Sequence, residues 1–414
     1  MTQVLPPRTV DAALRARAGA VIPGGMYGHM NAAGLPDAYP QFMTRGEGSR
    51  VWDADGNEYL DFMCGWGPVV LGRKDPVVEA AVRAQLDTGD LLDGPSPVMV
   101  DLAELLVELV PHADWSMLAK NGTDATTACV SIARASTGRR KVLLARGAYH
   151  GAIPWCTPRP GGVLPEDRAH LGYFEYNDVA SLEAAVAEAG DDLAGIIVSP
   201  VRQELASDQV MATVEFARAI RTACDRAGAV MILDDVRCGF RLDLGGSWEP
   251  LGVRPDLSAW SKAIANGYSL AAITGREPLR AAASSIYVTG SFWYSAVSMA
   301  ASIATLTQLR DTDALARMAA SGQRLRDGLA AQSAAHGFVT TQTGPVQMPL
   351  LQFADDAGSQ LARMWTNEAV KRGVYLHPVH NWFLSAAHTA DDIDLALERT
   401  DDAFAELARL THSA

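Results

Sequence analysis

Short apolar runs alternate with amphipathic segments through the middle of the chain. Five runs end in polar residues and predict buried strands: LLAR (143–146), GIIVSP (195–200), VMILDD (230–235), LSAWS (257–261) and LAAITGR (270–276). Helical segments near 123–137, 178–189 and 209–227 lie between them. Continuous apolar runs are typical of strands buried on both faces of a mostly parallel sheet. This βαβ rhythm predicts a doubly wound α/β domain, which binds ligands at the carboxyl ends of its strands.

The two ends of the chain have a different pattern. The first part combines an amphipathic helix (8–20), a hairpin with an Asp-Gly turn in VWDADGNEYLDF (51–62) and a helix opening at 75–83. The last part combines a long helix (313–334), extended pieces near 338–352, 374–377 and 382–386, and a helix from 390. We therefore expect a large domain over 71–311 and a smaller α+β domain over 312–414, which the segment 1–70 joins.

Composition narrows the class of protein. The 414 residues include 48 acidic and 35 basic side chains, a net charge of −13, and 48% are hydrophobic. This balance excludes intrinsic disorder, and the negative field disfavours binding to nucleic acids or to anionic membranes. We expect no membrane span, because no apolar run approaches about 20 residues, and no secretory leader, because the first residues, MTQVLPPRTVDAALRARAG, contain no apolar core. Five scattered cysteines without ligand spacing predict neither disulfides nor a metal site, and favour the cytoplasm.

A first candidate site is the segment Asn121-Gly122-Thr123, which precedes a predicted helix with Asp124 in its first turn. Glycine allows close approach to the backbone, and the free N–H groups of a helix start attract an anion. An ordinary N-cap by Thr123 or Asp124 explains the same pattern. On this motif alone we favour the cap.

A second candidate is the pair Asp234-Asp235 at the end of a buried strand. Ionised carboxylates there need a metal, a cation or hydrogen bonds, unless they only cap the following turn. A third candidate is Lys262, one of five lysines, which follows a strand inside a largely apolar segment. Such surroundings lower the pKa of an amine and make it nucleophilic, although a lysine on an exposed turn has the same pattern.

The three candidates together match the needs of pyridoxal phosphate. A helix start would bind its phosphate, a buried aspartate would keep its pyridine nitrogen protonated, and a desolvated lysine would form a Schiff base with it. We therefore expect a pyridoxal phosphate enzyme.

At this point the chain resembles the class III (subgroup II) aminotransferases of fold type I, and in particular the glutamate-1-semialdehyde aminomutase-like branch. The matching segments are PGG (23–25), VWDADGNEYLDF and GWGPVVLG (51–72), NGTDAT (121–126), YHG (149–151), YND (176–178), LDDVRCGFR (233–241), GVRPDLSAWSKAIANG (252–267) and FLSAAHTADDID (383–394). The resemblance implies a large domain with a mostly parallel seven-stranded sheet, and a homodimer with shared active sites.

The resemblance also implies roles for individual residues. Lys262 would form the Schiff base and move protons, and Asp234 would pair with the pyridine nitrogen. The cofactor would also contact Gly122 and Thr123 at its phosphate, and Val236, Tyr149, His150 and Arg237 around its ring. Tyr149 would stack on the ring as part of the catalytic set. Ser291 and Phe292 would lie near the phosphate of the neighbouring subunit.

Several positions depart from the family pattern. Asn121 replaces a serine, Arg237 replaces an uncharged residue, and Ser199-Pro200 replaces a Glu-Pro pair, with Glu204 following. Neither 26–34 nor 377–389, where family members carry an arginine that clamps a carboxylate, contains one. Arg237, Arg202 or Arg159 could substitute. Trp66, Tyr27, His29, Arg237 and Glu204 are the candidate substrate residues, in a site suited to a bulky or poorly charged amine, a sugar or an aromatic amino acid.

We expect an aminotransferase that moves an amino group between an amine or amino acid donor and a carbonyl acceptor by a ping-pong reaction. The alternative within the family is an aminomutase, or a racemase or epimerase. A nicotinamide- or nucleotide-binding protein lacks support because no G-x-G-x-x-G follows the first strand. A catalytically silent relative is disfavoured by the intact Lys262 and Asp234.

Overall fold

The computed structural model describes residues 2–412, and the chain divides into two compact units. The small unit comprises Met1–Asp75, Leu205–Asp208 and Ala314–Ala414, and the large unit comprises Pro76–Glu204 and Gln209–Asp313.

The large unit is built on a seven-stranded sheet with the order β4-β12-β11-β10-β7-β5-β6. The strands are β4 (Trp115–Ala119), β5 (Lys141–Ala145), β6 (Leu171–Phe174), β7 (Leu193–Val198), β10 (Val230–Asp234), β11 (Leu257–Trp260) and β12 (Ala271–Gly275). Only β12 is antiparallel to its neighbours, so the predicted mostly parallel sheet is confirmed. The pattern does not reveal the direction of β12, because a strand buried on both faces has the same composition in either direction.

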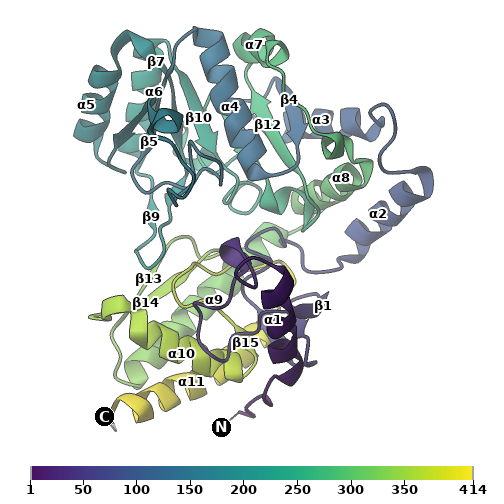
Figure 1. Cartoon of the computed structure of the whole chain (residues 1–414), viewed down its shortest axis with the longest axis vertical. Helices are drawn as coiled ribbons and strands as arrows, with labels where there is room; N and C mark the ends of the chain where they lie inside the picture. The colour runs from purple at the N-terminus through teal and green to yellow at the C-terminus, as the bar shows by residue number, and fades with distance from the viewer. Residues whose placement is uncertain (1, 413–414) are drawn as a thin grey trace. The chain divides into compact units, whose positions relative to one another are not determined.

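Helices cover both faces of this sheet (Figure 1). On one side α4 (Gly122–Thr137) and α7 (Arg280–Ser285) pack on it, and on the other α5 (Val179–Ala189) and α6 (Val214–Ala227). Alternate residues of β10 enter different cores: Val230 and Ile232 join the first, Met231 and Leu233 the second. The continuous apolar run in this strand is thus explained. Three more helices, α2 (Pro76–Thr88), α3 (Val98–Leu109) and α8 (Ala296–Asp311), pack together.

Some local predictions differ from the structure. The helix predicted from 209 begins only at Val214, since Thr213 caps it by accepting a hydrogen bond from Phe216 N. Residues 210–211 instead form β9 (Val210–Met211), which pairs with β8 (Val201–Arg202). The piece near 382–386 is not a strand, although Phe383, Leu384 and Ala386 donate backbone hydrogen bonds to other segments.

The small unit joins segments from both ends of the chain in one sheet, with the order β1-β2-β3-β15. Its strands are β1 (Met43–Glu47), β2 (Arg50–Asp53), β3 (Glu58–Asp61) and β15 (Val374–Tyr375), and β13 (Thr340–Thr343) pairs separately with β14 (Leu350–Phe353). The predicted hairpin is confirmed, because β2 pairs antiparallel with β3 around Gly56, whose φ is +84°. Helices α9 (Ala314–Ala335), α10 (Gln360–Lys371) and α11 (Ala390–His412) complete this unit.

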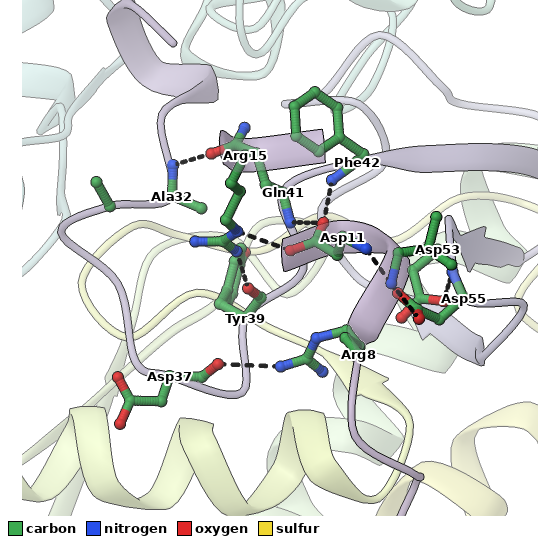
Figure 2. Close-up of polar contacts among 12 residues, drawn as sticks. Arg8, Asp11, Arg15, Ala32, Asp37, Tyr39, Gln41, Phe42, Asp53 and Asp55 are labelled. Atoms are coloured by element: carbon green, nitrogen blue, oxygen red, sulfur yellow. Dashed lines mark hydrogen bonds and ion pairs between the residues drawn. The ribbon is translucent and has the colours of Figure 1, made fainter. Parts of the chain in front are cut away.

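Helix α1 (Thr9–Val21) is fixed by carboxylates (Figure 2). Asp55 accepts hydrogen bonds from the backbone N–H groups of Thr9, Val10 and Asp11, and so acts as a cap supplied by the hairpin turn. The buried Asp11 accepts bonds from Gln41 N and Phe42 N and pairs with Arg15. These hydrogen bonds and the ion pair therefore anchor α1 to the rest of the small unit.

Candidate active site

A cavity of about 220 Å³ lies in the large unit, past the carboxyl ends of its parallel strands. Its wall comes from the segments that follow β4, β5, β7, β10 and β11. It includes Asn121, Gly122, Thr123, Tyr149, His150, Tyr176, Arg202, Gln203, Asp234, Val236, Arg237, Cys238 and Lys262. The three separate motifs of the sequence thus meet in one cavity.

Lys262 begins a short 3₁₀ turn directly after β11 and Ser261. Its φ of +48° lies in the left-handed region, which costs about 1 kcal/mol for a residue with a Cβ. Ser302 Oγ donates to Ile264 O and Ser261 Oγ to Leu270 O, which holds the turn in place. Burial and the positive charge of Arg237 lower the pKa of the Lys262 amine to about 8, and Asp234 opposes this shift. Near neutral pH a useful fraction of the amine is therefore unprotonated.

Asp234, the last residue of β10, is buried and has two hydrogen-bond partners. His150 Nδ1 lies 2.6 Å from its Oδ2, and Val236 N donates to Oδ1 at 3.2 Å. A carboxylate oxygen accepts hydrogen bonds, so we assign a proton to His150 Nδ1, which donates to Oδ2. His150 Nε2 is buried and has no hydrogen-bond partner among residues 2–412. Thr126 Oγ1 donates to His150 O at 2.6 Å and fixes the backbone there.

The start of α4 departs from the expected cap. Asn121, not Thr123 or Asp124, is the N-cap: its side chain accepts from Asp124 N, and the Asp124 carboxylate accepts from Asn121 N. This capping box explains why an asparagine works here in place of a serine. A Cβ at Gly122 would come within 2.7 Å of the Val236 side chain, so glycine is needed where this helix start meets the cavity wall.

These residues fit pyridoxal phosphate. Gly122 and Thr123 occupy the first helical positions, whose N–H groups lack partners within a helix and favour a phosphate. Asp234, oriented by His150, can pair with a protonated ring nitrogen, and the orphaned Nε2 is the kind of buried group that a ligand satisfies. Lys262 supplies an amine with a lowered pKa in the same cavity.

Tyr149 and Arg237 also line the cavity. Burial raises the pKa of the Tyr149 hydroxyl, and the charge of Arg237 opposes that effect. Burial likewise lowers the pKa of the Arg237 guanidinium. Asp235, by contrast, is completely buried and accepts bonds from Ser247 N and Oγ. The two adjacent aspartates therefore have different surroundings: Asp234 lines the cavity, whereas Asp235 holds the loop that contains Ser247.

Other predicted site residues do not line this cavity. Ser291 begins a short 3₁₀ turn, and the following Phe292 is 64% exposed. Glu204 lies beside Arg202, with 3.7 Å between Oε1 and Nε. Arg159 lies in an exposed segment. Cavity residues to which the sequence assigned no role are Tyr176, Gln203 and Cys238, although Tyr176 and Cys238 belong to the YND and LDDVRCGFR motifs.

The expected substrate residues Tyr27, His29 and Trp66 belong to the small unit. Trp66, with φ of +68°, contacts three imidazoles, with ring centroids 5.0 Å from His29, 5.4 Å from His377 and 5.0 Å from His380. Burial lowers the pKa of His377 to about 4, so its imidazole is neutral near pH 7. No role was predicted for His377 and His380, because 311 and 314 positions in the sequence separate them from Trp66 and only the fold brings them together.

Comparison with known proteins places this geometry in a family. The profile described as aminotransferase class-III matches residues 33–404. An aminopentol aminotransferase of Sphingopyxis macrogoltabida is 51% identical over 396 residues, which cover 96% of this chain and 94% of the relative. A glutamate-1-semialdehyde 2,1-aminomutase of Desulfatibacillum aliphaticivorans is 32% identical, over 95% of this chain and 99% of the relative. The similarity to the aminomutase branch is therefore the more distant one.

A solved structure agrees with this assignment. The pyridoxal phosphate internal aldimine form of the FumI protein of Sphingopyxis sp. MTA144 is 50% identical, and the match covers 98% of each chain with a TM-score of 0.97. The expected fold type I architecture and the expected cofactor are thus confirmed.

Proposed function

Because the chain belongs to the class-III aminotransferase family, we propose that it takes the amino group of an amine that carries hydroxyl groups in place of a carboxylate. It is a pyridoxal phosphate-dependent aminotransferase. The relative with 51% identity is named for an amino-substituted pentol.

The observation that carries this proposal is the chemistry around Trp66. The segments 26–34 and 377–389 contain histidines but no arginine, and three of these histidines contact the Trp66 ring. A guanidinium clamps a carboxylate with two parallel hydrogen bonds, whereas a neutral imidazole offers at most one donor and one acceptor. In His377 the acceptor Nδ1 is occupied by Val379 N and His380 N, so its ring offers a single uncharged donor at Nε2. A single uncharged donor of this kind suits the oxygen of a hydroxyl group.

The residues of the large unit have separate tasks in the proposed mechanism. When bound, pyridoxal phosphate supplies an electrophilic aldehyde and an electron-withdrawing ring. Lys262 Nζ, with its lowered pKa, is suited to remove the proton from the substrate Cα and to return it during the second half of the reaction. Arg237 keeps that pKa low through its charge. Asp234 holds negative charge against the ring nitrogen, and the His150 hydrogen bond orients its carboxylate.

The remaining contacts bind the cofactor. The N–H groups of Gly122 and Thr123 at the start of α4 would hold the phosphate. Val236 and Tyr149 line the same cavity and would contact the ring of the bound cofactor.

The protein is proposed to act as a cytoplasmic homodimer in which Ser291 and Phe292 reach the partner's site. Phe292 and Tyr287 are 64% and 92% exposed, which is unusual for side chains of this size and typical of a surface that pairs. All five cysteines are buried thiols, as expected in a reducing compartment. No helix within residues 2–412 has the length and apolar character needed to cross a bilayer.

Matched donor pairs test the proposed substrate class. Serinol and serine differ only in a hydroxymethyl group against a carboxylate, and so do 2-aminobutanol and 2-aminobutyrate. The reaction is followed by the loss of the absorbance band of the bound pyridoxal phosphate as it takes up the amino group of the donor. We expect kcat/KM for the amino alcohols to be about tenfold or more above that for the amino acids. Faster reaction of the amino acids would refute the proposal. Isomerisation of the donor without any carbonyl acceptor would identify an aminomutase or epimerase instead.

A further inference from the structure

A loosely paired arginine lines the cavity at the end of β8. Arg202 is one of two arginines in the wall, and its side chain is 32% exposed. Its backbone is fixed, because β8 pairs with β9 and because Tyr176 Oη donates to the carbonyls of Ser199 and Pro200. The guanidinium is thus presented from a rigid base.

The hydrogen-bonding capacity of Arg202 is not used up. Its Nε is buried and has no hydrogen-bond partner among residues 2–412. The carboxylate of Glu204 lies 3.7 Å from that nitrogen, which is within ion-pair range but beyond a hydrogen bond. An arginine that lines a ligand cavity with a buried free donor is equipped to receive a second carboxylate.

Glu204 occupies a notch that only glycine leaves open. A Cβ at Gly147 would lie 2.5 Å from the Glu204 carboxyl carbon, and Gly147 has φ of +74°. The Glu204 side chain is 39% exposed, so it remains accessible to water. Glu204 can therefore neutralise Arg202 while a substrate without charge is bound, and it can yield to a better-placed carboxylate.

The other candidate arginines are less suited to this task. Arg237 acts directly on the pKa of Lys262 and of Tyr149, so it belongs to the cofactor machinery. Arg159 is exposed and lies outside the cavity wall.

We propose that Arg202 binds the carboxylate of the amino acceptor, a 2-oxo acid, and that Glu204 is its resting counter-ion. This inference rests on the proposed function, since a donor without a carboxylate and an acceptor with one must use the same site in turn. In the complete reaction the acceptor's carbonyl oxygen is replaced by an amino group and a hydrogen. The donor carbon undergoes the reverse exchange, so no external oxidant is needed.

The acceptor half of the reaction can be tested without any donor. Protein loaded with pyridoxamine 5′-phosphate is mixed with pyruvate or with hydroxyacetone, which has a hydroxymethyl group instead of the carboxylate. Single-turnover rates then give an apparent Kd and a limiting rate for each. For Arg202→Gln we expect the Kd for pyruvate to rise about 10- to 100-fold, the effect of losing one charge-assisted partner, with the limiting rate nearly unchanged. The values for hydroxyacetone should stay within about twofold.

Three further variants sharpen the result. Arg202→Lys should bind pyruvate more tightly than Arg202→Gln does, but less tightly than the wild type. Glu204→Gln should bind pyruvate more tightly than the wild type, because a competing carboxylate is removed. Arg276→Gln, a matched change in a different cavity of the same unit, should have no effect on either Kd. An unchanged pyruvate Kd in Arg202→Gln, or an equal loss with both acceptors, would overturn the inference. Since no donor is used, failure of the amino alcohols in the earlier test would be recognised separately.

Discussion

Two cavities of the large unit contain arginines, and they use them differently. The second cavity, of about 500 Å³, is lined by Arg221, Arg254 and Arg276 and is larger than the candidate active site. Its arginines are matched by carboxylates at hydrogen-bond distance. Arg221 pairs with Asp225 at 2.7 Å and Asp256 at 2.8 Å, Arg254 pairs with Glu249 at 2.6 Å, and Arg276 pairs with Asp256 at 3.2 Å.

In the smaller cavity the balance of charge is reversed. Lys262, Arg237 and Arg202 face one buried carboxylate, Asp234, while Glu204 stays 3.7 Å from Arg202. Within residues 2–412 the Nε of Arg221 also has no hydrogen-bond partner, but its other nitrogens pair with two carboxylates. Size therefore does not identify the functional cavity. An excess of positive charge does, because a phosphate and a substrate carboxylate can supply the missing negative charge.

The largest effect is expected for Lys262→Ala. This change removes the one amine in the wall of the smaller cavity, and with it the group that moves the proton at the substrate Cα. Turnover should fall by at least about 100-fold, a typical contribution of one general acid–base group. Steady-state kinetics with a saturating donor and acceptor measure it. Retained turnover would mean that the wrong cavity has been assigned.

A matched pair of aspartate changes compares the two cavities directly. Asp234→Asn should reduce kcat by about 100-fold, because the neutral amide no longer favours a protonated ring nitrogen. Asp256→Asn removes a carboxylate that accepts from Arg221, Arg276 and Met231 N. It should lower the unfolding free energy by about 1–3 kcal/mol and leave kcat per folded site unchanged. A comparable kcat loss in both variants would remove the distinction between the cavities.

A smaller effect, on pH dependence, is expected for Arg237→Gln. The Lys262 amine has a pKa of about 8, so the rate at which apoprotein binds pyridoxal phosphate covalently should rise with pH through a midpoint near 8. Removing the positive charge of Arg237 stabilises the protonated amine and should move the midpoint upwards by about one pH unit. Stopped-flow absorbance at a series of pH values measures it. A midpoint that does not move, or moves downwards, would contradict the assigned role of Arg237.

The sequence predicted the smaller cavity better than the small unit. Asp234 and Lys262 each follow a buried strand, and the carboxyl ends of parallel strands meet at one edge of a sheet, so local pattern was enough to bring them together. The Trp66 cluster could not be found in this way. His377 and His380 lie in an irregular segment without periodicity, and their contact with Trp66 depends on how the two ends of the chain fold together.

The misassigned cap of α4 and the misjudged start of α6 have a common cause. Side chains of Asn, Asp and Thr near a helix start compete for the same N–H groups, and sequence alone does not decide which one succeeds. Asn121 caps α4 and Thr213 caps α6 only because each has an extended backbone at the required position. The unpaired donor of Arg202 was equally hidden, since it depends on the distance to Glu204.

The smallest effect is expected for Arg276→Gln in the larger cavity. The guanidinium is 51% exposed, and Asp256 keeps its bonds to Arg221 and to Met231 N without it. Exposed ion pairs of this kind contribute about 0–1 kcal/mol, so the melting temperature should fall by no more than a few degrees. The kcat and KM for either substrate should stay within about twofold of the wild-type values. A large change in KM for a 2-oxo acid would show that an arginine paired with carboxylates can still bind a substrate. An excess of positive charge would then no longer distinguish the functional cavity from the other one.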